Sequence, residues 1–359
     1  MAVTGDLRVV TASLGGVRVY HLSGSLDAAD PRSLLAQLPS VVRSAEAQVV
    51  SHTVVAPRAH HAEGMRALEE ASGAVPWPVT WIDGGGATAR MQACAVAGAG
   101  VRYLERDGRP VGAVWEDADA YHCWLGDIRA ADASLSREDQ ARATFEGIEE
   151  ALGLVDLGFE HVVRTWLFVD QILEWYGSFN EVRTRFFDER GVFGRFLPAS
   201  TGIGAANPAG GSVVAQAIAL RPARAEVEVR EVESPLQCPA TEYRSSFSRA
   251  VEVRRGGVRQ VYVSGTASID PGGDTVHRGD LGRQIEHTMD VVEAILGARG
   301  LGWENLLRGI VYFKDGSDAA GFERHCLERG VPLSPLIVTQ GTVCRDELLF
   351  EIEVDAFGT

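Results

Sequence analysis

Two stretches of the chain repeat one spacing of apolar residues. In residues 140–152 (QARATFEGIEEAL) and again in residues 284–296 (QIEHTMDVVEAIL), apolar side chains recur at offsets of 0, 4, 7 and 11. This spacing is typical of an amphipathic helix with one buried face. Ser136, three residues before Asp139, has the chemistry of an N-cap for the first helix. We therefore predict two equivalent helices.

Each predicted helix is followed by an apolar stretch that indicates a strand. The stretches VVRTWLFVD (162–170) and LLRGIVYFKD (306–315) begin at the same distance from their helices, so Arg164 and Arg308 occupy equivalent positions. The same order of helix and strand at the same spacing in two places indicates an internal repeat.

The repeat extends along the whole chain. Strand hairpins ending in Ser-Gly or Gly-Ser precede the first helix of a unit, and a second helix and a final strand close it. The first hundred residues follow this order in shortened form. Hairpins are predicted at 15–25 and 256–266, second helices at 179–190 and 318–330, and final strands at 212–220 and 348–357. In the first hundred residues, strands are predicted at 18–26, 48–56 and 91–100, and helices at 31–45 and 60–71.

These patterns predict three units: 1–100, 101–225 and 226–359. Mixed strands with two helices on one face form an α+β sandwich. The order β-β-α-β-α-β and the closing strand LLFEIEVDAF resemble the YjgF-like family, the reactive-intermediate deaminases with a chorismate-mutase-like fold. That family forms trimers with a ligand site in each cleft between subunits. The resemblance implies an intramolecular pseudo-trimer in which the clefts differ.

The closing strand of the last unit carries an acid at every second position. Glu351 lies between apolar neighbours, and Glu353 and Asp355 follow nearer the strand end, whereas the middle unit has no carboxylate at residues 214–216. We predict that Glu351 is the one inward carboxyl, facing a cleft between units. A carboxyl there would have a raised pKa, as a general acid requires. The alternative is that all three acids line a solvated sheet face.

Composition and charge narrow the possible partners. The chain has 34 Lys and Arg against 49 Asp and Glu, a net charge of −15, which disfavours nucleic acid and anionic membranes. Its five cysteines are scattered without a ligand spacing, so we expect reduced thiols, no structural zinc and a cytoplasmic location. No signal peptide is visible, and no apolar run approaches the ~20 residues of a membrane helix.

A more specific resemblance covers roughly residues 100–359. Five segments resemble the chorismatases, YjgF-like enzymes that remove pyruvate from chorismate. The resemblance implies cleavage of an enolpyruvyl ether with chorismate as substrate and with no metal or organic cofactor. The segments are TWLFVDQILEWYGSFNEVRTRFF, LPASTGIGAANPAGGSVVAQAIALRP, EYRSSFSRA, VYVSGTASID and CRDELLFEIE.

Candidate residues follow from the chemistry of this reaction. An enol ether reacts once its methylene carbon is protonated, and Glu351 is the candidate acid. Chorismate carries two carboxylates, whose burial requires paired charges, for which Arg is well suited. Arg164 and Arg249 are the candidates. Arg183 is a further one, for which a solvated helix charge is the alternative.

Other roles are implied by the resemblance alone. Tyr243, Thr201 and Gln216 are supporting polar groups at the substrate. A cysteine at the position of Cys344 goes with the branch that forms 3-hydroxybenzoate; the alternative is a small buried hydrophobe. The other branch hydrolyses chorismate to a 3,4-dihydroxycyclohexa-1,5-diene carboxylate. Arg244 fits neither branch.

Two further alternatives stay open. An imine deaminase of this fold would carry an arginine about fifteen positions before Glu351, but this sequence has Leu336 there. A non-catalytic ligand-binding member of the fold is the other alternative. Because a pseudo-trimer removes the need to oligomerise, we expect a monomer.

Overall fold

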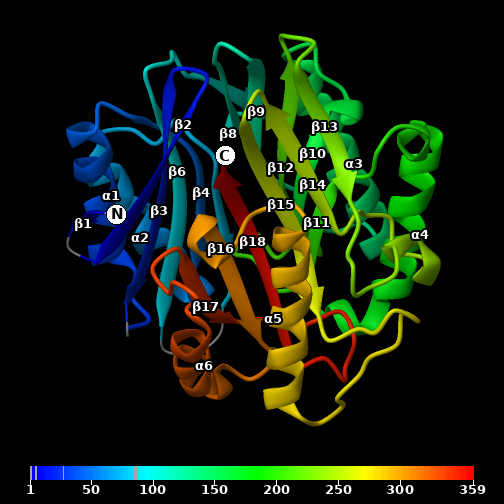
Figure 1. The fold of residues 1–359 in the computed structure, drawn as a ribbon. Helices are drawn as coiled ribbons and strands as arrows, with labels where there is room; N and C mark the ends of the chain where they lie inside the picture. The colour runs from blue at the N-terminus through cyan, green and yellow to red at the C-terminus, as the bar shows by residue number, and fades with distance from the viewer. Residues whose placement is uncertain (1, 5, 27, 85–87) are drawn as a thin grey trace.

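The computed structural model describes residues 2–4, 6–26, 28–84 and 88–359 (Figure 1). In this part of the chain the strands form three six-stranded sheets. The first sheet has the order β1 (Ala2–Thr4), β2 (Leu7–Leu14), β3 (Val17–Leu26), β6 (Ala89–Ala97), β4 (Gln48–Val55) and β5 (Val79–Ile82). The second has β7 (Arg102–Arg106), β8 (Arg109–Glu116), β9 (Ala120–Ile128), β12 (Val213–Pro222), β10 (Val162–Val169) and β11 (Ala199–Gly204). The third has β13 (Val227–Val232), β14 (Ala250–Arg255), β15 (Val258–Ala267), β18 (Phe350–Gly358), β16 (Leu306–Phe313) and β17 (Leu336–Gln340).

Two helices cover the outer face of each sheet. They are α1 (Arg32–Ser44) and α2 (His61–Ser72), α3 (Arg137–Gly153) and α4 (Ile172–Glu189), and α5 (Leu281–Gly297) and α6 (Phe322–Arg329). Ser136 caps α3 as predicted, by accepting a hydrogen bond from the backbone N–H of Asp139. Among the described residues, no helix has the length and apolar character needed to cross a bilayer.

The three sheets have one topology, which confirms the predicted pseudo-trimer. In every sheet the closing strand (β6, β12 or β18) lies between the last strand before the first helix and the strand that follows that helix. The strand after the first helix has a register shift at an equivalent place in all three units, directly before Ser51, Arg164 and Arg308. The predicted equivalence of Arg164 and Arg308 is therefore confirmed.

Each unit has more strands than the predicted order. A short strand follows the second helix and pairs in parallel with the strand between the helices: β5 with β4, β11 with β10 and β17 with β16. These strands have four to six residues. They lie in segments rich in Gly, Pro, Ser and Thr. In such segments apolar and polar residues do not alternate regularly, so the apolar pattern did not predict these strands.

The sheets meet around a shared core at the centre of the molecule. Buried residues from all three sheets form one continuous cluster there, including Val19, Trp166 and Tyr312. A separate apolar core lies between each sheet and its own pair of helices. In Figure 1 the helices accordingly lie on the outside of the molecule. Clefts between units are thus built from the sheet of one unit and elements of its neighbour.

Candidate active site

Strand β18 presents its acids to the centre of the molecule. Its apolar residues, Phe350, Ile352, Val354 and Ala356, pack in the core between the third sheet and helices α5 and α6. Since side chains alternate along a strand, the intervening Glu351, Glu353 and Asp355 must face the other way. The apolar pattern thereby fixes the orientation of all three carboxyls.

All three acids of β18 are buried. The exposed fractions of Glu351, Glu353 and Asp355 are 4%, 0% and 1%. The alternative of a solvated sheet face is therefore wrong. The expectation that Glu351 is the one inward carboxyl is also wrong, because the strict alternation of β18 turns Glu353 and Asp355 inward with it.

Glu351 lines a cavity of about 170 Å³ between helix α4 of the middle unit and the last unit. The middle unit contributes two side chains of α4, and the last unit contributes the remaining walls. The other two closing strands have no acid at the place of Glu351, which pairs with Tyr312 of β16. Arg90 of β6, paired with Val55, and Val214 of β12, paired with Phe168, occupy the equivalent positions. The cavity, here called the acid pocket, is lined by Tyr176, Asn180, Tyr243, Ser245, Phe247, Arg249, Gly265, Ala267, Ile269, Cys344, Arg345, Leu348 and Glu351.

The environment of Glu351 favours its neutral form. Burial and the nearby charge of Glu353 raise the pKa of Glu351 to about 8, and Arg164 opposes them only in part. In the described part of the chain, no hydrogen bond or ion pair reaches the Glu351 carboxyl. The carboxyl also lies against the backbone of Gly265, where a Cβ would come within 2.2 Å of Glu351 Oε1. The pocket therefore holds a proton-bearing carboxyl at neutral pH.

Arginines without an acidic partner surround the pocket. Arg249 is buried and donates from Nε to the Cys238 carbonyl at 2.8 Å, while its Nη2 has no hydrogen-bond partner. Arg345 donates to the Gly273 carbonyl at 2.8 Å. Among the described residues neither forms an ion pair with a carboxylate. Positive charge held this way is suited to an anionic ligand.

The aromatic ring of Tyr243 fixes these two arginines. The Cζ atoms of Arg249 and Arg345 lie 5.2 and 5.1 Å from the centre of that ring. Burial raises the pKa of Tyr243 to about 12, so its phenol is neutral. The contact holds both guanidinium groups at the pocket by cation–π attraction without neutralising them.

Arg183 lies behind the wall of the pocket. It is 2% exposed and donates from Nη2 to Asn180 Oδ1 at 2.6 Å, and burial lowers its pKa. The alternative of a solvated helix charge is therefore wrong. Through Asn180, which lines the pocket, this third arginine adds to its positive character.

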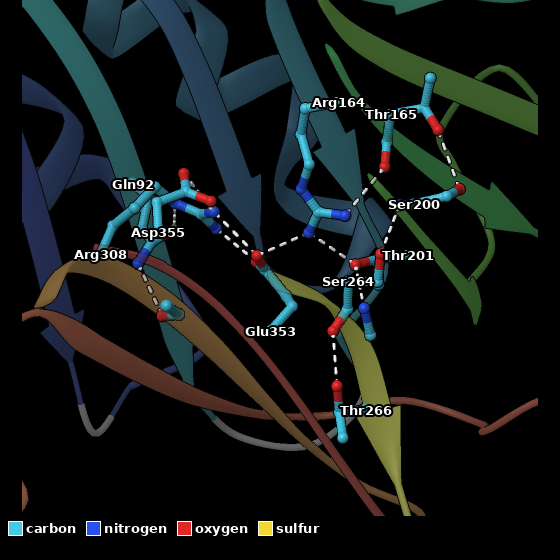
Figure 2. Close-up of polar contacts among 12 residues, drawn as sticks. Gln92, Arg164, Thr165, Ser200, Thr201, Ser264, Thr266, Arg308, Glu353 and Asp355 are labelled. Carbon is cyan, nitrogen blue, oxygen red and sulfur yellow. Dashed lines mark hydrogen bonds and ion pairs between the residues drawn. The ribbon is translucent and has the colours of Figure 1, made fainter. Parts of the chain in front are cut away.

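Arg164 lies behind the pocket rather than in it. Its Nη2 donates to Glu353 Oε2 at 2.8 Å and to Thr201 Oγ1 at 2.7 Å (Figure 2). Glu353 also pairs with Arg308, whose Nη1 donates to Asp355 at 3.2 Å. The four charged residues, Arg164, Arg308, Glu353 and Asp355, form an ion cluster in which Arg164 is already paired. This position gives no support to its predicted contact with substrate.

Thr201 and Gln216 are polar and buried but do not line the acid pocket. Thr201 Oγ1 accepts hydrogen bonds from Arg164 and from the backbone N–H of Gly265, the latter at 3.1 Å. Thr201 therefore joins the ion cluster to the strand behind Glu351. Gln216 donates to Thr53 at 2.8 Å beside another small interior cavity, between the first and second sheets.

Cys344 lines the acid pocket beside Glu351. Burial, together with the charge of Glu351, raises the pKa of Cys344 to about 12, so the thiol is protonated. This thiol contacts Tyr176 of α4, whose own pKa burial raises. A neutral thiol is also what a small buried hydrophobe would have. The Cys344 side chain, however, faces the cavity.

A larger chamber of about 850 Å³ adjoins the acid pocket and shares Asn180, Tyr243 and Ser245 with it. It lies between α4 and the segment that contains the short helix Ala240–Tyr243. Arg244 lines this chamber, in a left-handed conformation with φ of 64°. Arg244 is therefore at the approach to the pocket rather than inside it.

The pocket contains residues that sequence reasoning missed. Tyr176 and Asn180, four residues apart on α4, face the same side of the helix and could have been noticed as a polar pair. Arg345 and Ser245 lie in irregular segments, where no periodicity indicates the direction of a side chain. Within the described residues, no group of three or more His, Cys, Asp or Glu side chains could hold a metal ion.

Comparisons with known proteins place this chain in a family and match its fold. The family profile described as Endoribonuclease L-PSP matches residues 239–357. A chorismatase from Streptomyces rapamycinicus is 33% identical over 236 residues, which are 59% of this chain and 68% of that protein. A 3-hydroxybenzoate synthase from Streptomyces hygroscopicus is 31% identical over 228 residues, 56% of this chain and 64% of that protein. A crystal structure of a chorismatase, 20% identical, superimposes with a TM-score of 0.66 over 86% of this chain and 92% of its own.

Proposed function

Because this chain belongs to the chorismatase family of enzymes, we propose that the acid pocket binds chorismate and cleaves its enolpyruvyl ether, releasing pyruvate and 3-hydroxybenzoate. The observation that carries the proposal is the neutral Glu351 carboxyl in a pocket bordered by arginines without acidic partners. The ligand is thus a small, anionic molecule.

Glu351 is the proposed general acid. Protonation of the methylene carbon of the enolpyruvyl group gives an oxocarbenium ion, which a hydroxyl or water can capture. A group with a pKa of about 8 is mostly protonated at neutral pH and still acidic enough to donate. An ordinary glutamate would be ionised there and could not start the reaction.

The arginines are the proposed partners of the two chorismate carboxylates. Arg249 and Arg345 line the pocket, and Arg183 adds positive charge from behind Asn180. Burying a dianion is costly unless its charges are paired, and unpaired guanidinium groups offset this cost when the ligand arrives. The proposal places no substrate contact on Arg164, because Glu353 and Thr201 already engage it.

The product branch is assigned from Cys344 and the pocket walls. Together 3-hydroxybenzoate and pyruvate contain every atom of chorismate, so this route consumes no water, whereas the dihydroxycyclohexadiene route consumes one. Phe247, Ile269 and Leu348 are apolar walls, and the neutral thiol of Cys344 is a weak hydrogen-bonding group. A pocket that holds water poorly favours attack by the hydroxyl of the ring, which proximity assists.

The alternatives have less support in this pocket. Leu336, at the place where the deaminases would carry an arginine, is buried in β17 and cannot bind a carboxylate. A purely ligand-binding protein would have no use for a carboxyl kept neutral against its normal tendency to ionise. The dihydroxycyclohexadiene product is the remaining alternative for the same reaction site.

Chromatography of the products tests the proposal. Purified protein is incubated with chorismate, and an enzyme-free sample corrects for the spontaneous decay of chorismate. We expect equal amounts of pyruvate and 3-hydroxybenzoate, identified against authentic standards. The dihydroxycyclohexadiene carboxylate as sole ring product would overturn the branch assignment, and unchanged chorismate would overturn the function.

A further inference from the structure

A second carboxyl lies next to Glu351 on β18 and is locked in ion pairs. Glu353 is two residues along the same face of the strand, so the two carboxyls project side by side. Glu353 Oε2 accepts hydrogen bonds from Arg164 Nη2 at 2.8 Å and from Arg308 Nη1 at 2.9 Å, and Oε1 accepts from Arg308 Nη2 (Figure 2). Every ionised oxygen of Glu353 is therefore held by a guanidinium group.

These contacts make Glu353 a fixed anion. Burial opposes its ionisation, but Arg308 and Arg164 outweigh burial and lower the pKa of Glu353. Glu351 has neither arginine as a hydrogen-bond partner, although its carboxyl is nearly as deeply buried. Two neighbouring carboxyls of one strand are thus kept in opposite protonation states.

We propose that Glu353 is a positioning residue of the reaction: held as an anion by Arg164 and Arg308, it keeps the neighbouring Glu351 carboxyl in the protonated form that donates to the substrate. This proposal rests on the proposed role of Glu351 as general acid. A like charge close by disfavours ionisation, whereas an unbalanced cation favours it. Without Glu353, the charge of Arg164 would act on Glu351 uncompensated.

The tyrosines and the cysteine around Glu351 do not change charge near neutral pH. Tyr312 faces it from β16, and burial raises the pKa of Tyr312 well above its usual value. Burial raises the pKa values of Cys344 and Tyr243 to about 12, and that of Tyr176 also rises. Arg249 and Arg345 line the same pocket. Asp355 lies beyond Glu353 and is bonded to Arg308, and burial raises the pKa of Asp355. A titration near pH 8 therefore belongs to Glu351 where Glu351→Gln abolishes it and Asp355→Asn leaves it in place.

For two variants that break the same ion pair, we predict opposite shifts of the pH profile of activity. Activity requires protonated Glu351, so kcat/KM for pyruvate release falls as pH rises through the pKa of Glu351. Glu353→Gln removes the anion and leaves Arg164 uncompensated, so we expect this alkaline limb to move at least one pH unit lower. Arg164→Gln removes a cation while Arg308 still holds Glu353, so we expect the limb to move to higher pH.

A purely structural role for the Arg164–Glu353 pair makes a different prediction. Loss of the pair would then lower activity in both variants without moving the limb, or would move it in the same direction, and either result overturns the proposal. Glu228→Gln, at an exposed glutamate paired with Arg254 on the same sheet, is the matched control and should leave the limb in place. If Glu353→Gln does not fold, the upward shift in Arg164→Gln decides the question.

The proton on Glu351 can also be followed without turnover. The infrared carbonyl band of a protonated carboxylic acid that disappears in Glu351→Gln reports this proton directly. We expect the band to persist to about pH 8 in the wild type and to be lost at lower pH in Glu353→Gln. A band unmoved by Glu353→Gln overturns the role of Glu353, whereas failure to consume chorismate overturns only the proposed function.

Discussion

At the scale of single residues, we expect Cys344 to decide which nucleophile reaches the cation. Its neutral thiol fills space beside Glu351 and binds water weakly. We expect Cys344→Ala to leave room for a water molecule and to shift the products from 3-hydroxybenzoate toward the dihydroxycyclohexadiene carboxylate. Chromatography of both products against standards measures the ratio. An unchanged ratio at an unchanged rate would show that Cys344 does not control the branch.

Glu351 should also make the stability of the protein depend on pH. Its pKa is about 8 in the folded protein against 4.5 ordinarily, so between these values the folded state retains a proton that the unfolded chain has released. The free energy of unfolding therefore falls as pH rises through this window. A glutamine has no such proton.

The Glu351→Gln variant should accordingly be no more stable than the wild type at about pH 4.5 and more stable at about pH 8. The upper bound on the difference is on the order of 5 kcal/mol, because each pH unit between the folded and unfolded pKa values contributes about 1.4 kcal/mol. Denaturant unfolding at the two pH values measures it. A wild type that keeps the stability of the variant at the higher pH would contradict a raised pKa.

At the scale of elements, the approach of β15 to β18 sets the place of the acid. A Cβ on Gly265 would meet Glu351 Oε1 at 2.2 Å and Thr201 Cγ2 at 3.2 Å. We expect Gly265→Ala to displace the carboxyl and to lower kcat by at least ~10-fold, with an overpacking cost of about 1–3 kcal/mol. Steady-state kinetics and thermal unfolding measure the two effects.

The matched control for this variant is Gly257→Ala. Gly257 lies in the turn before β15, and its Cβ would meet nothing within 4 Å. The control should keep the wild-type kcat and stability. If Gly265→Ala also kept the wild-type kcat, the close contact between Gly265 and Glu351 would have no role in positioning the acid.

Strong periodicity explains which elements could be predicted from the sequence. Clear apolar patterns mark the two helices predicted at 140–152 and 284–296. Such patterns also mark the strands that carry Arg164 and Arg308, and all four elements are present. The parallel strands β5, β11 and β17 were missed, because their four to six residues are too few to show a clear period. Pairing along a neighbouring strand, which no local pattern encodes, defines them.

The site was predictable only in part. The alternation of β18 led to Glu351, and the resemblance to the chorismatases led to Cys344, Arg249 and Tyr243, which all reach one pocket. Arg164 and Gln216 do not line this pocket. The carboxylate that engages Arg164 comes from another unit, 189 residues further along the chain. A contact between residues so far apart cannot be predicted from their spacing in the sequence.

At the scale of the whole molecule, one chain supplies what three subunits supply in a trimer of this fold. The three sheets share a central core, and two units of the same chain wall the acid pocket. We expect a monomer, with a mass of 38.6 kDa by light scattering. A stable trimer of this chain would contradict the expected monomer. The division into units at residues 1–100, 101–225 and 226–359 stays a prediction.

Pyruvate release from chorismate by the wild type and by Glu351→Gln is the measurement that tests the central claim most directly. Glu347→Gln, the same substitution at an exposed position of the same segment, is the matched control. We predict that the wild type and the control release pyruvate at equal rates and that folded Glu351→Gln is slower by at least ~100-fold. Turnover by Glu351→Gln at the wild-type rate would contradict the role of Glu351 as the general acid.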